Sequence, residues 1–464
     1  MTNEDEMKNL HSLFHAKSIA IVGASSNPEK TGHVILKNII DGGFEGQIYP
    51  INPKSSEILG WSCFQSLTDI PAEKVDLVII VVPAKFVPSV IEDAAKKQVN
   101  CMVIISGGFR EAGNEDMENA VLKTCKKYGI RFVGPNCQGI TYTPNNLCAA
   151  WPLMKKKGPM SIISQSGTVG AAFAGWAEDD NIGLTSFVSL GNKSDINEID
   201  LMQYFSQDPS TKVIGMYLEG VKNGRDFMTI GKKTINNKPI VILRPGRTAK
   251  GSIAAQSHTK SIAGDYKIFD AACKQAGIIK ADTVYELYDF CKILSLCKKP
   301  KGNRCLIITS SGGSAILATD VAENHNVNIV SLNDKIKALL HQSLPSHCII
   351  GNPLDLTGDT NAERYYETVK KIKSASNIDT ILLIFGDPIP DNDRYIQKIK
   401  EDVDQEIIAC YIGAGDMQTR EVLNLHEIGI PTFPTPERAM KAISALVQYK
   451  NFVQKSISKL EDKN

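Results

Sequence analysis

The amino-acid sequence predicts an α/β protein whose strands form parallel sheets. Apolar segments of four to seven residues, such as 19–22 and 76–82, alternate with longer segments of mixed polarity, such as 84–98 and 114–128. Short apolar runs are typical of strands buried on both faces, and their alternation with helices is typical of a parallel sheet covered by helices. The other strands expected in this first region are 47–51, 101–106 and 131–133.

A chain of 464 residues is long enough for about three domains. Two polar, proline-containing segments divide it, one at 141–157 and one at 298–303, and we interpret both as linkers. We therefore expect domains at 1–144, 145–297 and 298–464. The strands expected in the second and third domains include 185–188, 213–218, 240–243, 380–385 and 406–412.

An internal repeat links the second and third domains. Residues 162–167 (IISQSG) and 307–312 (IITSSG) share an apolar strand, hydroxyl side chains and a glycine, and small residues suited to a helix follow each. Each repeat would place N–H groups at a helix start, where anions bind, although one helix dipole contributes only about 0.3–1 kcal/mol. Two helix starts aimed at one phosphoryl group would hold it better, whereas the alternative is two ordinary N-terminal caps. The candidate phosphate-binding residues are Gln165, Ser166, Gly167, Ser310, Ser311, Gly312 and Gly313.

The composition is that of an ordinary globular protein, with 42% hydrophobic and 22% charged residues. The formal net charge of +1 gives no sign of a nucleic-acid-binding surface, and no apolar run approaches the ~20 residues that cross a bilayer. No signal peptide is recognisable at the acidic N-terminus. The 11 cysteines include no Cys-x-x-Cys pair, which favours reduced thiols and a cytoplasmic protein. The charged tail after Tyr449 is expected to be a fraying helix.

Polar and glycine-rich turns follow the strands of the first domain. Residues 23–25 (GAS) are similar to a dinucleotide-binding turn, but the G-x-G-x-x-G fingerprint is absent. Residues 52–54 (NPK) replace the acid that binds the ribose of NAD, and a lysine suits a phosphate instead. One such turn could be a plain tight turn, but several at one sheet edge favour phosphate or nucleotide binding. The candidate ligand-binding residues are Gly23, Ala24, Ser25, Asn27, Asn52, Pro53, Lys54, Val82, Pro83, Ser106, Gly107, Gly108 and Asn136.

The segment 246–265 is the most distinctive part of the sequence. It follows the predicted strand 240–243, is rich in small residues, and carries His258 between two hydroxyl residues. Long segments without periodicity are usually functional or disordered. A neutral imidazole, whose ordinary pKa is about 6.5, has one ring nitrogen able to attack phosphorus. We therefore interpret His258 as a covalent phosphate carrier on a mobile loop.

A nucleophilic histidine needs an acceptor that holds its other ring nitrogen. Glu219 is the best candidate, because it directly follows the apolar strand 213–218 at the edge where ligands bind. The alternative is an exposed acid at the sheet edge with no such role. The sequence contains no Walker A motif and no kinase-type glycine loop with a lysine partner. A nucleoside triphosphate would therefore bind to a partner subunit, and no metal site is expected in this chain.

Taken together, these motifs resemble the alpha subunit of ADP-forming acyl-CoA synthetases of the acetate–CoA ligase type, in the succinyl-CoA synthetase superfamily. The resemblance implies a Rossmann-like CoA-binding domain followed by two flavodoxin-like ligase domains. It also implies that the strand-end residues of the first domain bind CoA, that His258 is the phosphorylated nucleophile, and that Glu219 orients it. The resemblance covers essentially the whole chain, in the motifs 23–25 (GAS), 52–54 (NPK), 106–109 (SGGF), 134–139 (GPNCQG), 164–167 (SQSG), 189–193 (SLGNK), 217–220 (YLEG) and 257–259 (SHT).

The resemblance further implies an acid–thiol ligase. Such an enzyme converts acyl-CoA, ADP and phosphate reversibly into carboxylate, CoA and ATP, through an acyl phosphate and a phosphohistidine. CoA would be a substrate of this chain, whereas ADP or ATP and Mg²⁺ would bind an ATP-grasp beta subunit in an α2β2 heterotetramer. Lys260 replaces the family's usual glycine after Ser-His-Thr, which leaves the motion of the loop open. The acyl group and the physiological direction are open as well.

Two other classes of function are weighed against this one. A non-catalytic CoA-binding regulator would lack His258, and the CoA-binding half of a protein acetyltransferase would carry a further domain for which no residues remain. An NAD-dependent oxidoreductase is disfavoured by the absent glycine fingerprint and by residues 52–54.

Overall fold

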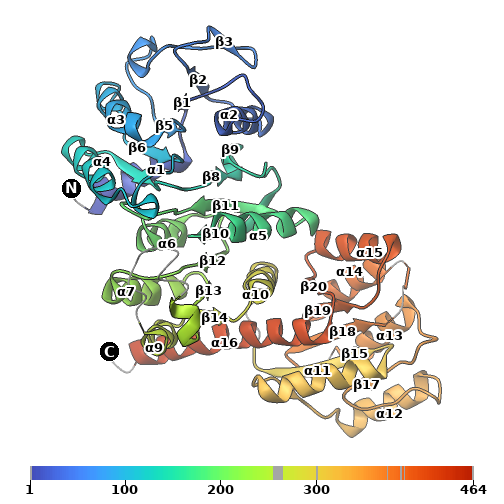
Figure 1. Ribbon diagram of the computed structural model, residues 1–464. Coiled ribbons are helices and arrows are strands. Elements are labelled where there is room, and N and C mark those ends of the chain that lie inside the picture. The colour runs from blue at the N-terminus through green and yellow to red at the C-terminus, as the bar shows by residue number, and fades with distance from the viewer. Residues whose placement is uncertain are drawn as a thin grey trace. The chain divides into compact units, whose positions relative to one another are not determined.

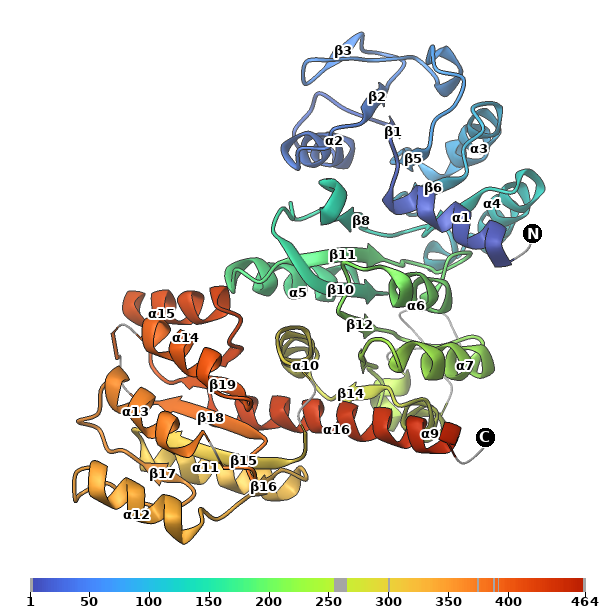
Figure 2. The ribbon, with the colours of Figure 1, turned by 180° about the vertical axis from the view of Figure 1, so that it is seen from behind.

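The computed structural model describes residues 3–253, 265–298, 301–373, 375–386, 389–390 and 392–461. The chain forms two compact units: Met1–Asp179 with Gly183–Lys280, and Asp180–Ile182 with Ala281–Asn464. The first unit contains two of the three large sheets and the second unit contains the third (Figures 1 and 2). These parallel sheets confirm the predicted α/β class. No helix within the described ranges has the length and apolar character needed to span a bilayer.

The first sheet has five parallel strands in the order β2-β1-β5-β6-β7. Helices α3 and α4 lie on one face of this sheet and α2 lies on the other (Figures 1 and 2). Its strands are β1 (Ser18–Val22), β2 (Gln47–Ile51), β5 (Leu77–Ile80), β6 (Cys101–Ile104) and β7 (Arg131–Val133), with the small hairpin β3 (Glu57–Ile58) and β4 (Trp61–Ser62). Its helices are α1 (Asn3–Phe14), α2 (Thr31–Asp41), α3 (Val87–Lys96) and α4 (Glu115–Tyr128), with 3-10 turns η1 (Leu67–Asp69), η2 (Ala84–Phe86) and η3 (Arg110–Ala112).

The strand order reverses beside β1, because β2 lies on one side of it and β5 on the other. The four residues of β5 and the four of β6 are all buried, as expected for strands covered on both faces. In such sheets, ligands bind at the carboxyl ends of the strands near the point of reversal. The predicted ligand turns after β1, β2 and β5 therefore share one edge of the sheet.

The second sheet has seven strands in the order β14-β13-β12-β10-β11-β8-β9. Its strands are β8 (Gly139–Tyr142), β9 (Leu147–Ala150), β10 (Lys157–Ser164), β11 (Leu184–Ser189), β12 (Val213–Tyr217), β13 (Ile240–Leu243) and β14 (Ile279–Ala281). Its helices are α5 (Gly167–Asp179), α6 (Glu198–Gln207), α7 (Gly224–Ile235) and α9 (Tyr266–Ala276), and the 3-10 turn η4 (Thr143–Asn145) joins β8 to β9.

The interpretation of residues 141–157 as a linker was wrong. This stretch contains the end of β8, all of β9 and the start of β10, and β8 pairs antiparallel with both β9 and β11. All eight residues of β8 and β9 are buried. The two prolines suggested a linker, but Pro144 lies in the turn between the strands and Pro152 lies after the second strand.

Gly139 allows the β8–β9 hairpin to close. Its φ is +101°, and a Cβ atom at this position would lie 2.0 Å from the carbonyl oxygen of Ala149. Because both the backbone angle and the close approach oppose a side chain, Gly139→Ala is expected to lower the free energy of unfolding by about 2–4 kcal/mol. Urea unfolding followed by circular dichroism would measure this change.

Gly175 provides the matched control, since it lies within α5 and a Cβ atom there would meet nothing within 4 Å. Alanine is the better helix former, so Gly175→Ala should leave stability unchanged or raise it by up to about 1 kcal/mol. Equal unfolding midpoints for the two variants would contradict the role assigned to Gly139.

The third sheet lies in the second unit and is parallel, in the order β16-β15-β18-β19-β20, with β17 also pairing with β15. Its strands are β15 (Arg304–Thr309), β16 (Asn328–Ile329), β17 (Leu354–Asp355), β18 (Thr380–Phe385), β19 (Glu406–Tyr411) and β20 (Thr432–Phe433). Its helices are α10 (Val284–Leu296), α11 (Gly312–Asn324), α12 (Asp334–Ser343), α13 (Ala362–Ile372), α14 (Asn392–Asp402), α15 (Asp416–Glu427) and α16 (Pro436–Glu461). The helix expected after Tyr449 is the C-terminal part of α16. Helix α16 as a whole packs against α10 and α11.

Asp180 is held within the second unit by buried polar partners. Its carboxylate accepts hydrogen bonds from the Tyr288 hydroxyl at 2.6 Å and from Lys292 Nζ at 3.0 Å. His426 Nδ1 lies 2.9 Å from the Asp180 carbonyl oxygen, and its Nε2 accepts the N–H of Thr432 at 3.3 Å. Burial, together with the charge of Lys292, lowers the pKa of His426 to about 4. The histidine is therefore neutral at pH 7 and serves as a core residue.

Candidate functional site

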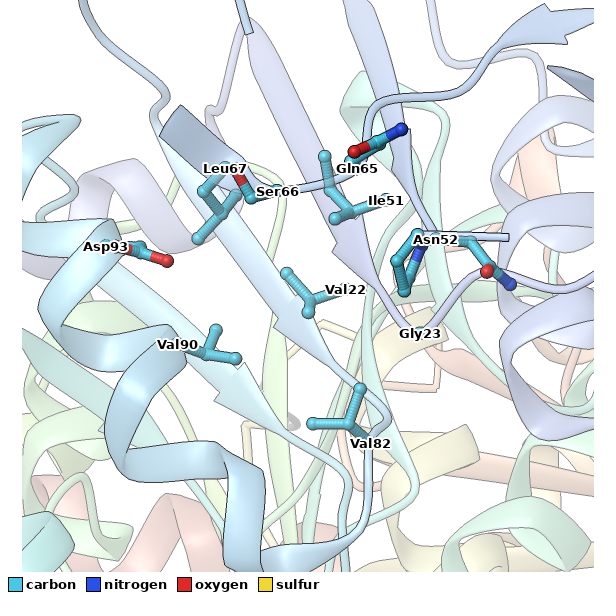
Figure 3. A pocket seen from close by; sticks show the side chains of 11 residues that line it. Val22, Gly23, Ile51, Asn52, Gln65, Ser66, Leu67, Val82, Val90 and Asp93 are labelled. Carbon is cyan, nitrogen blue, oxygen red and sulfur yellow. The ribbon is translucent and has the colours of Figure 1, made fainter. Parts of the chain in front are cut away.

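A first cavity of about 340 Å³ opens at the carboxyl ends of β1, β2 and β5 (Figure 3). The side chains of Val22, Val82 and Val90 face it from two strand ends and from α3, and Asn52 lies at its margin (Figure 3). Four of the predicted ligand-binding residues line this cavity, where apolar walls meet a few polar groups. Its lining comprises Val22, Gly23, Ile51, Asn52, Pro53, Gln65, Ser66, Leu67, Val82, Val90 and Asp93.

The turn after β1 packs tightly against the start of α2. Gly23 has a φ of +99°, and a Cβ atom on Gly32 would lie 1.9 Å from the Gly23 carbonyl oxygen. Asn52 Nδ2 donates a hydrogen bond to the Ala24 carbonyl at 2.8 Å, so the turns after β1 and β2 are joined. His33 Nδ1 lies 2.9 Å from the Ser25 carbonyl oxygen. These contacts bring together the predicted residues after β1 and β2.

Two further predicted residues belong to the same pair of turns. Asn27 donates its N–H to Ser25 Oγ at 3.1 Å and accepts the N–H of Glu29 at 2.9 Å. Asn52 Oδ1 accepts the N–H of Lys54 at 2.9 Å. The Lys54 side chain is exposed, so its charge is available at the rim of the site.

A second cavity, of about 730 Å³, lies at the carboxyl ends of β5, β6 and β7 and reaches the start of α5. It brings predicted ligand-binding residues of the first sheet together with Gly167, a predicted phosphate-binding residue. Val82 lines both cavities. The second cavity is lined by Lys30, Thr31, Val81, Val82, Pro83, Ile105, Ser106, Gly107, Asn136, Cys137, Gln138, Trp151, Gly167, Thr168 and Ser189.

Glu111 holds the turn after β6 in place. Its carboxylate accepts the N–H groups of Gly108 at 2.6 Å and Phe109 at 3.1 Å, and it also accepts Asn192 Nδ2 at 2.6 Å. Burial raises the pKa of Glu111, but the hydrogen bonds from Asn192 and from the two N–H groups outweigh burial and lower it. Asn136 Nδ2 donates to Asn192 Oδ1 at 3.3 Å. The loop after β11 is thereby joined to the predicted turns after β6 and β7.

The same loop approaches the backbone after β7 very closely. Gly191 has a φ of +54°, and a Cβ atom there would lie 2.3 Å from the Pro135 carbonyl oxygen. The N–H of Asn192 donates to that oxygen at 2.9 Å, and the N–H of Ser194 donates to the Gly134 carbonyl at 3.1 Å. The motif 189–193 therefore connects the two sheets of the first unit at the second cavity.

Gln165 joins the start of α5 to Glu219. Its Oε1 accepts the N–H of Glu219 at 2.8 Å and that of Gly220 at 3.3 Å. Lys193, buried beside Glu198 at 2.8 Å, donates to the Gly220 carbonyl at 2.7 Å. Glu219 itself is only 7% exposed, so it is a buried acid, and its role in orienting His258 stays a prediction.

The two predicted phosphate-binding turns have the same local structure. Ser164 Oγ donates to the Ser166 carbonyl at 2.6 Å, and Thr309 Oγ1 donates to the Ser311 carbonyl at 2.9 Å. Each hydroxyl ends a central strand and bonds two residues ahead at a helix start, as expected for two copies of one unit. The surroundings differ, since a Cβ atom on Gly312 would lie 2.7 Å from a carboxylate oxygen of Asp355.

The side chains of Ser310 and Ser311 are engaged at the start of α11. Ser310 Oγ accepts the N–H of Gly386 at 2.9 Å, and Ser311 Oγ lies 2.8 Å from Ser314 Oγ. That the starts of α5 and α11 share one phosphoryl group stays a prediction.

His258 and Lys260 fall in residues 254–264, outside the described residues. Among the residues that are described, no group of three or more His, Cys, Asp and Glu side chains is placed to hold a metal ion.

Sequence reasoning missed several residues of the second cavity. Lys30 and Thr31 stand just after the glycine turn, where the start of a helix could have suggested them. Gln138 lies within the motif 134–139, in which only Asn136 was predicted to bind a ligand. Trp151 falls in a presumed linker, and only the pairing of β8 with β9 and β11 brings it to the site. No local signal in the sequence marks Trp151.

Family models match the chain in three successive segments. A CoA binding domain matches residues 17–143, a succinyl-CoA ligase like flavodoxin domain matches 157–294, and a ligase-CoA domain matches 305–451. Over 459 residues, the chain is 39% identical to subunit alpha of ADP-forming acetate–CoA ligase I of Pyrococcus furiosus, covering 96% of this chain and 99% of that subunit. The chain belongs to the ADP-forming acetate–CoA ligase family. The family, whose named members are acid–thiol ligases, is the one that the sequence motifs resemble.

Other members of the family have a longer chain. ADP-forming acetate–CoA ligase I of Archaeoglobus fulgidus is 38% identical to this chain over 440 residues, which are 94% of this chain but only 63% of that protein. The solved structure of acetyl-coenzyme A synthetase 1 of Ca. Korarchaeum cryptofilum, in complex with phosphate and ADP, superposes with a TM-score of 0.90 at 35% identity. That match covers 97% of this chain and 99% of the other, and it confirms the predicted fold.

Proposed function

We propose that this chain is the alpha subunit of an ADP-forming acyl-CoA synthetase. It would catalyse the reversible conversion of acyl-CoA, ADP and phosphate into carboxylate, CoA and ATP. The observation that carries the proposal is the second cavity, which Ser106 and Asn136 line on one side and the start of α5 at Gly167 lines on another. A thioester and a phosphate ion could therefore meet in one space. Membership of the ADP-forming acetate–CoA ligase family supports the same reaction.

A CoA thioester suits the two cavities as one elongated ligand. The largely apolar first cavity, with Asn52 at its margin, suits the flat adenine base. The turn 23–27, the N–H groups at the start of α2 and the charge of Lys54 suit the phosphates of CoA. Because Val82 lines both cavities, the pantetheine arm can pass it and bring the sulfur towards Asn136.

The chemistry would proceed in three transfers. A phosphate oxygen attacks the thioester carbonyl carbon, the C–S bond breaks, and the CoA thiolate leaves and takes up a proton. A ring nitrogen of His258 then attacks phosphorus in the acyl phosphate, the bond from phosphorus to the acyl oxygen breaks, and the carboxylate leaves. The phosphoryl group finally passes to the terminal phosphate of ADP. Transfers of this kind depend mainly on positioning and on neutralising charge.

Residues of this chain supply both requirements in the proposal. The N–H groups at the start of α5 would neutralise the phosphate, and Glu219 would hold the imidazole of His258. The start of α5 is the stronger phosphate site of the two, because the carboxylate of Asp355 already lies beside Gly312 at the start of α11.

The nucleotide would bind to a second polypeptide. The single-chain relative from Archaeoglobus fulgidus is longer than this chain, which matches 63% of its length. We infer that the remaining part corresponds to an ATP-grasp beta subunit, which would bind ADP or ATP with Mg²⁺ in a cytoplasmic α2β2 complex. The subunit name of the Pyrococcus furiosus relative supports a separate partner.

The experiment that tests the proposal measures release of free thiol from acetyl-CoA by the chain together with its beta subunit. We expect release only when ADP, phosphate and Mg²⁺ are all present, with ATP formed in equal amount. The same mixture without the beta subunit is the control and should form no ATP. Binding of CoA without cleavage under any of these conditions would indicate a regulator, and transfer of the acetyl group to protein lysines would indicate an acetyltransferase.

A further inference from the structure

The wall of the second cavity beside α5 contains one large aromatic side chain. Of the fifteen described residues that line this cavity, Trp151 is the only aromatic one. It lies directly after β9, and the residue as a whole is half-buried. Neither the sequence motifs nor the family resemblance assigns it a role.

The β8–β9 hairpin fixes the position of Trp151. Gly139 pairs with Ala150, the residue just before the tryptophan. Gln138 Nε2 donates a hydrogen bond to the Trp151 carbonyl at 2.8 Å, and the N–H of Gln138 donates to Ser189 Oγ at 2.9 Å. The backbone of Trp151 is therefore held by both its own hairpin and the end of β11.

Gln138 also connects Trp151 to the predicted phosphate site. A Cβ atom on Gly167 would lie 2.2 Å from Gln138 Oε1 and 3.1 Å from Gln138 Cδ. The amide side chain thus packs directly against the first residue of α5 while it holds the backbone of Trp151. The tryptophan and the start of α5 belong to the same wall of the cavity.

The reaction geometry places the acyl group against this wall, an argument that rests on the proposed function. The sulfur would arrive from the side of Ser106 and Asn136, and the attacking phosphate would lie at Gly167. The carbonyl carbon must lie between them, beside Gln138, which packs against Gly167, so its substituent can extend along Gln138 towards Trp151. We propose that Trp151 is a specificity-determining residue that limits the size of the acyl group to short chains.

A smaller side chain at position 151 should admit longer acyl groups. One methylene in an apolar pocket changes kcat/KM by about 10–200-fold. We therefore expect Trp151→Leu to raise the ratio of kcat/KM for butyryl-CoA to that for acetyl-CoA by at least about 10-fold. The affinity for CoA itself, measured by calorimetry, should stay within about twofold, because the indole does not line the first cavity.

The experiment compares acetyl-, butyryl- and phenylacetyl-CoA in the thiol-release assay, with the beta subunit, ADP and phosphate. Trp61→Leu is the matched control, because Trp61 lies in the small β3–β4 hairpin and lines neither cavity. If the leucine variant does not fold, the same kcat/KM ratio is measured in Trp151→Phe, which is a milder change. The inference is supported if the ratio of kcat/KM for butyryl-CoA to that for acetyl-CoA rises in the Trp151 variants and stays unchanged in Trp61→Leu.

Two results would overturn the inference. An unchanged ratio in folded Trp151 variants would show that the indole does not limit acyl size, and an equal loss for all three thioesters would show a purely structural role. Both results leave the proposed function standing, since the unaltered chain still cleaves acetyl-CoA. Failure of the unaltered chain to cleave any thioester would instead overturn the proposed function, and the inference with it.

Discussion

Asparagine in place of His258 is expected to abolish transfer of phosphate from ATP onto this chain. Asparagine keeps a polar side chain of similar reach but has no nucleophilic ring nitrogen, so the covalent step has no acceptor. Removing the nucleophile of a covalent enzyme typically costs on the order of 10⁶ in rate, which is complete loss in practice. Incubation with radiolabelled ATP, Mg²⁺ and the beta subunit, followed by measurement of acid-labile protein-bound label, would detect the change. Net ATP synthesis from acetyl-CoA should disappear in parallel.

His341 offers the control for this substitution. It is exposed on α12, and His341→Asn should incorporate as much label as the unaltered chain. Acid-labile label that still enters His258→Asn would show that another residue carries the phosphoryl group. Loss of label in both variants would point to general damage.

Glu219→Gln should slow formation of the phosphohistidine by at least about 10²-fold while CoA binding stays intact. A carboxylate both orients an imidazole and stabilises its charged form, whereas an amide of the same shape lacks the charge. The buried position of Glu219, with its N–H bonded to Gln165, suits a fixed orienting role. Rapid-quench measurement of label transfer would give the rate, and calorimetry would give the affinity for CoA.

Glu363 is the matched position for the same exchange, since it is exposed in the first turn of α13. Glu363→Gln should leave both the transfer rate and CoA affinity unchanged. If Glu219→Gln weakens CoA binding as much as it slows transfer, then Glu219 supports the structure of the site and does not orient the histidine.

The parallel strands were predictable because a strand buried on both faces consists of consecutive apolar residues. The segments β1, β5 and β6 consist almost wholly of apolar residues, and the structure places them centrally in the first sheet. The repeated strand, hydroxyl and glycine pattern also predicted that β10 and β15 would lead into equivalent helices. In each of these cases, the information lies within a few consecutive residues.

The β8–β9 hairpin was not predictable in the same way. Its strands have four residues each, they are separated by a proline-containing turn, and their order beside β11 is antiparallel in an otherwise parallel region. Proline and polar residues are ordinary signs of a linker. What makes the stretch a pair of strands is pairing with β11, some forty residues later in the chain, which no local pattern records.

The residues of the candidate site differ in the same way, since some were predictable from local sequence and others were not. The glycine turns follow strands of the first sheet and Glu219 follows β12 of the second, so the rule that ligands bind at strand ends predicted on which edge of its own sheet each of them lies. Gln138 and Trp151 reach the second cavity through the hairpin and its contact with the end of β11, and Glu111 supports the turn after β6 through its bond with Asn192. Their contribution depends on tertiary contacts, which a single sequence does not reveal.

The hairpin has a practical consequence for engineering this family by exchange of domains. The CoA binding domain match ends at residue 143, between β8 and β9, so a chimera spliced there would join half a hairpin from each parent. A junction between Trp151 and the start of β10 keeps both strands from one parent. Trp151 then comes from the parent that supplies the CoA-binding part, whereas the start of α5 comes from the other parent. A designer who intends to transplant only the CoA-binding half would thereby transplant part of the wall against which the acyl group is proposed to lie.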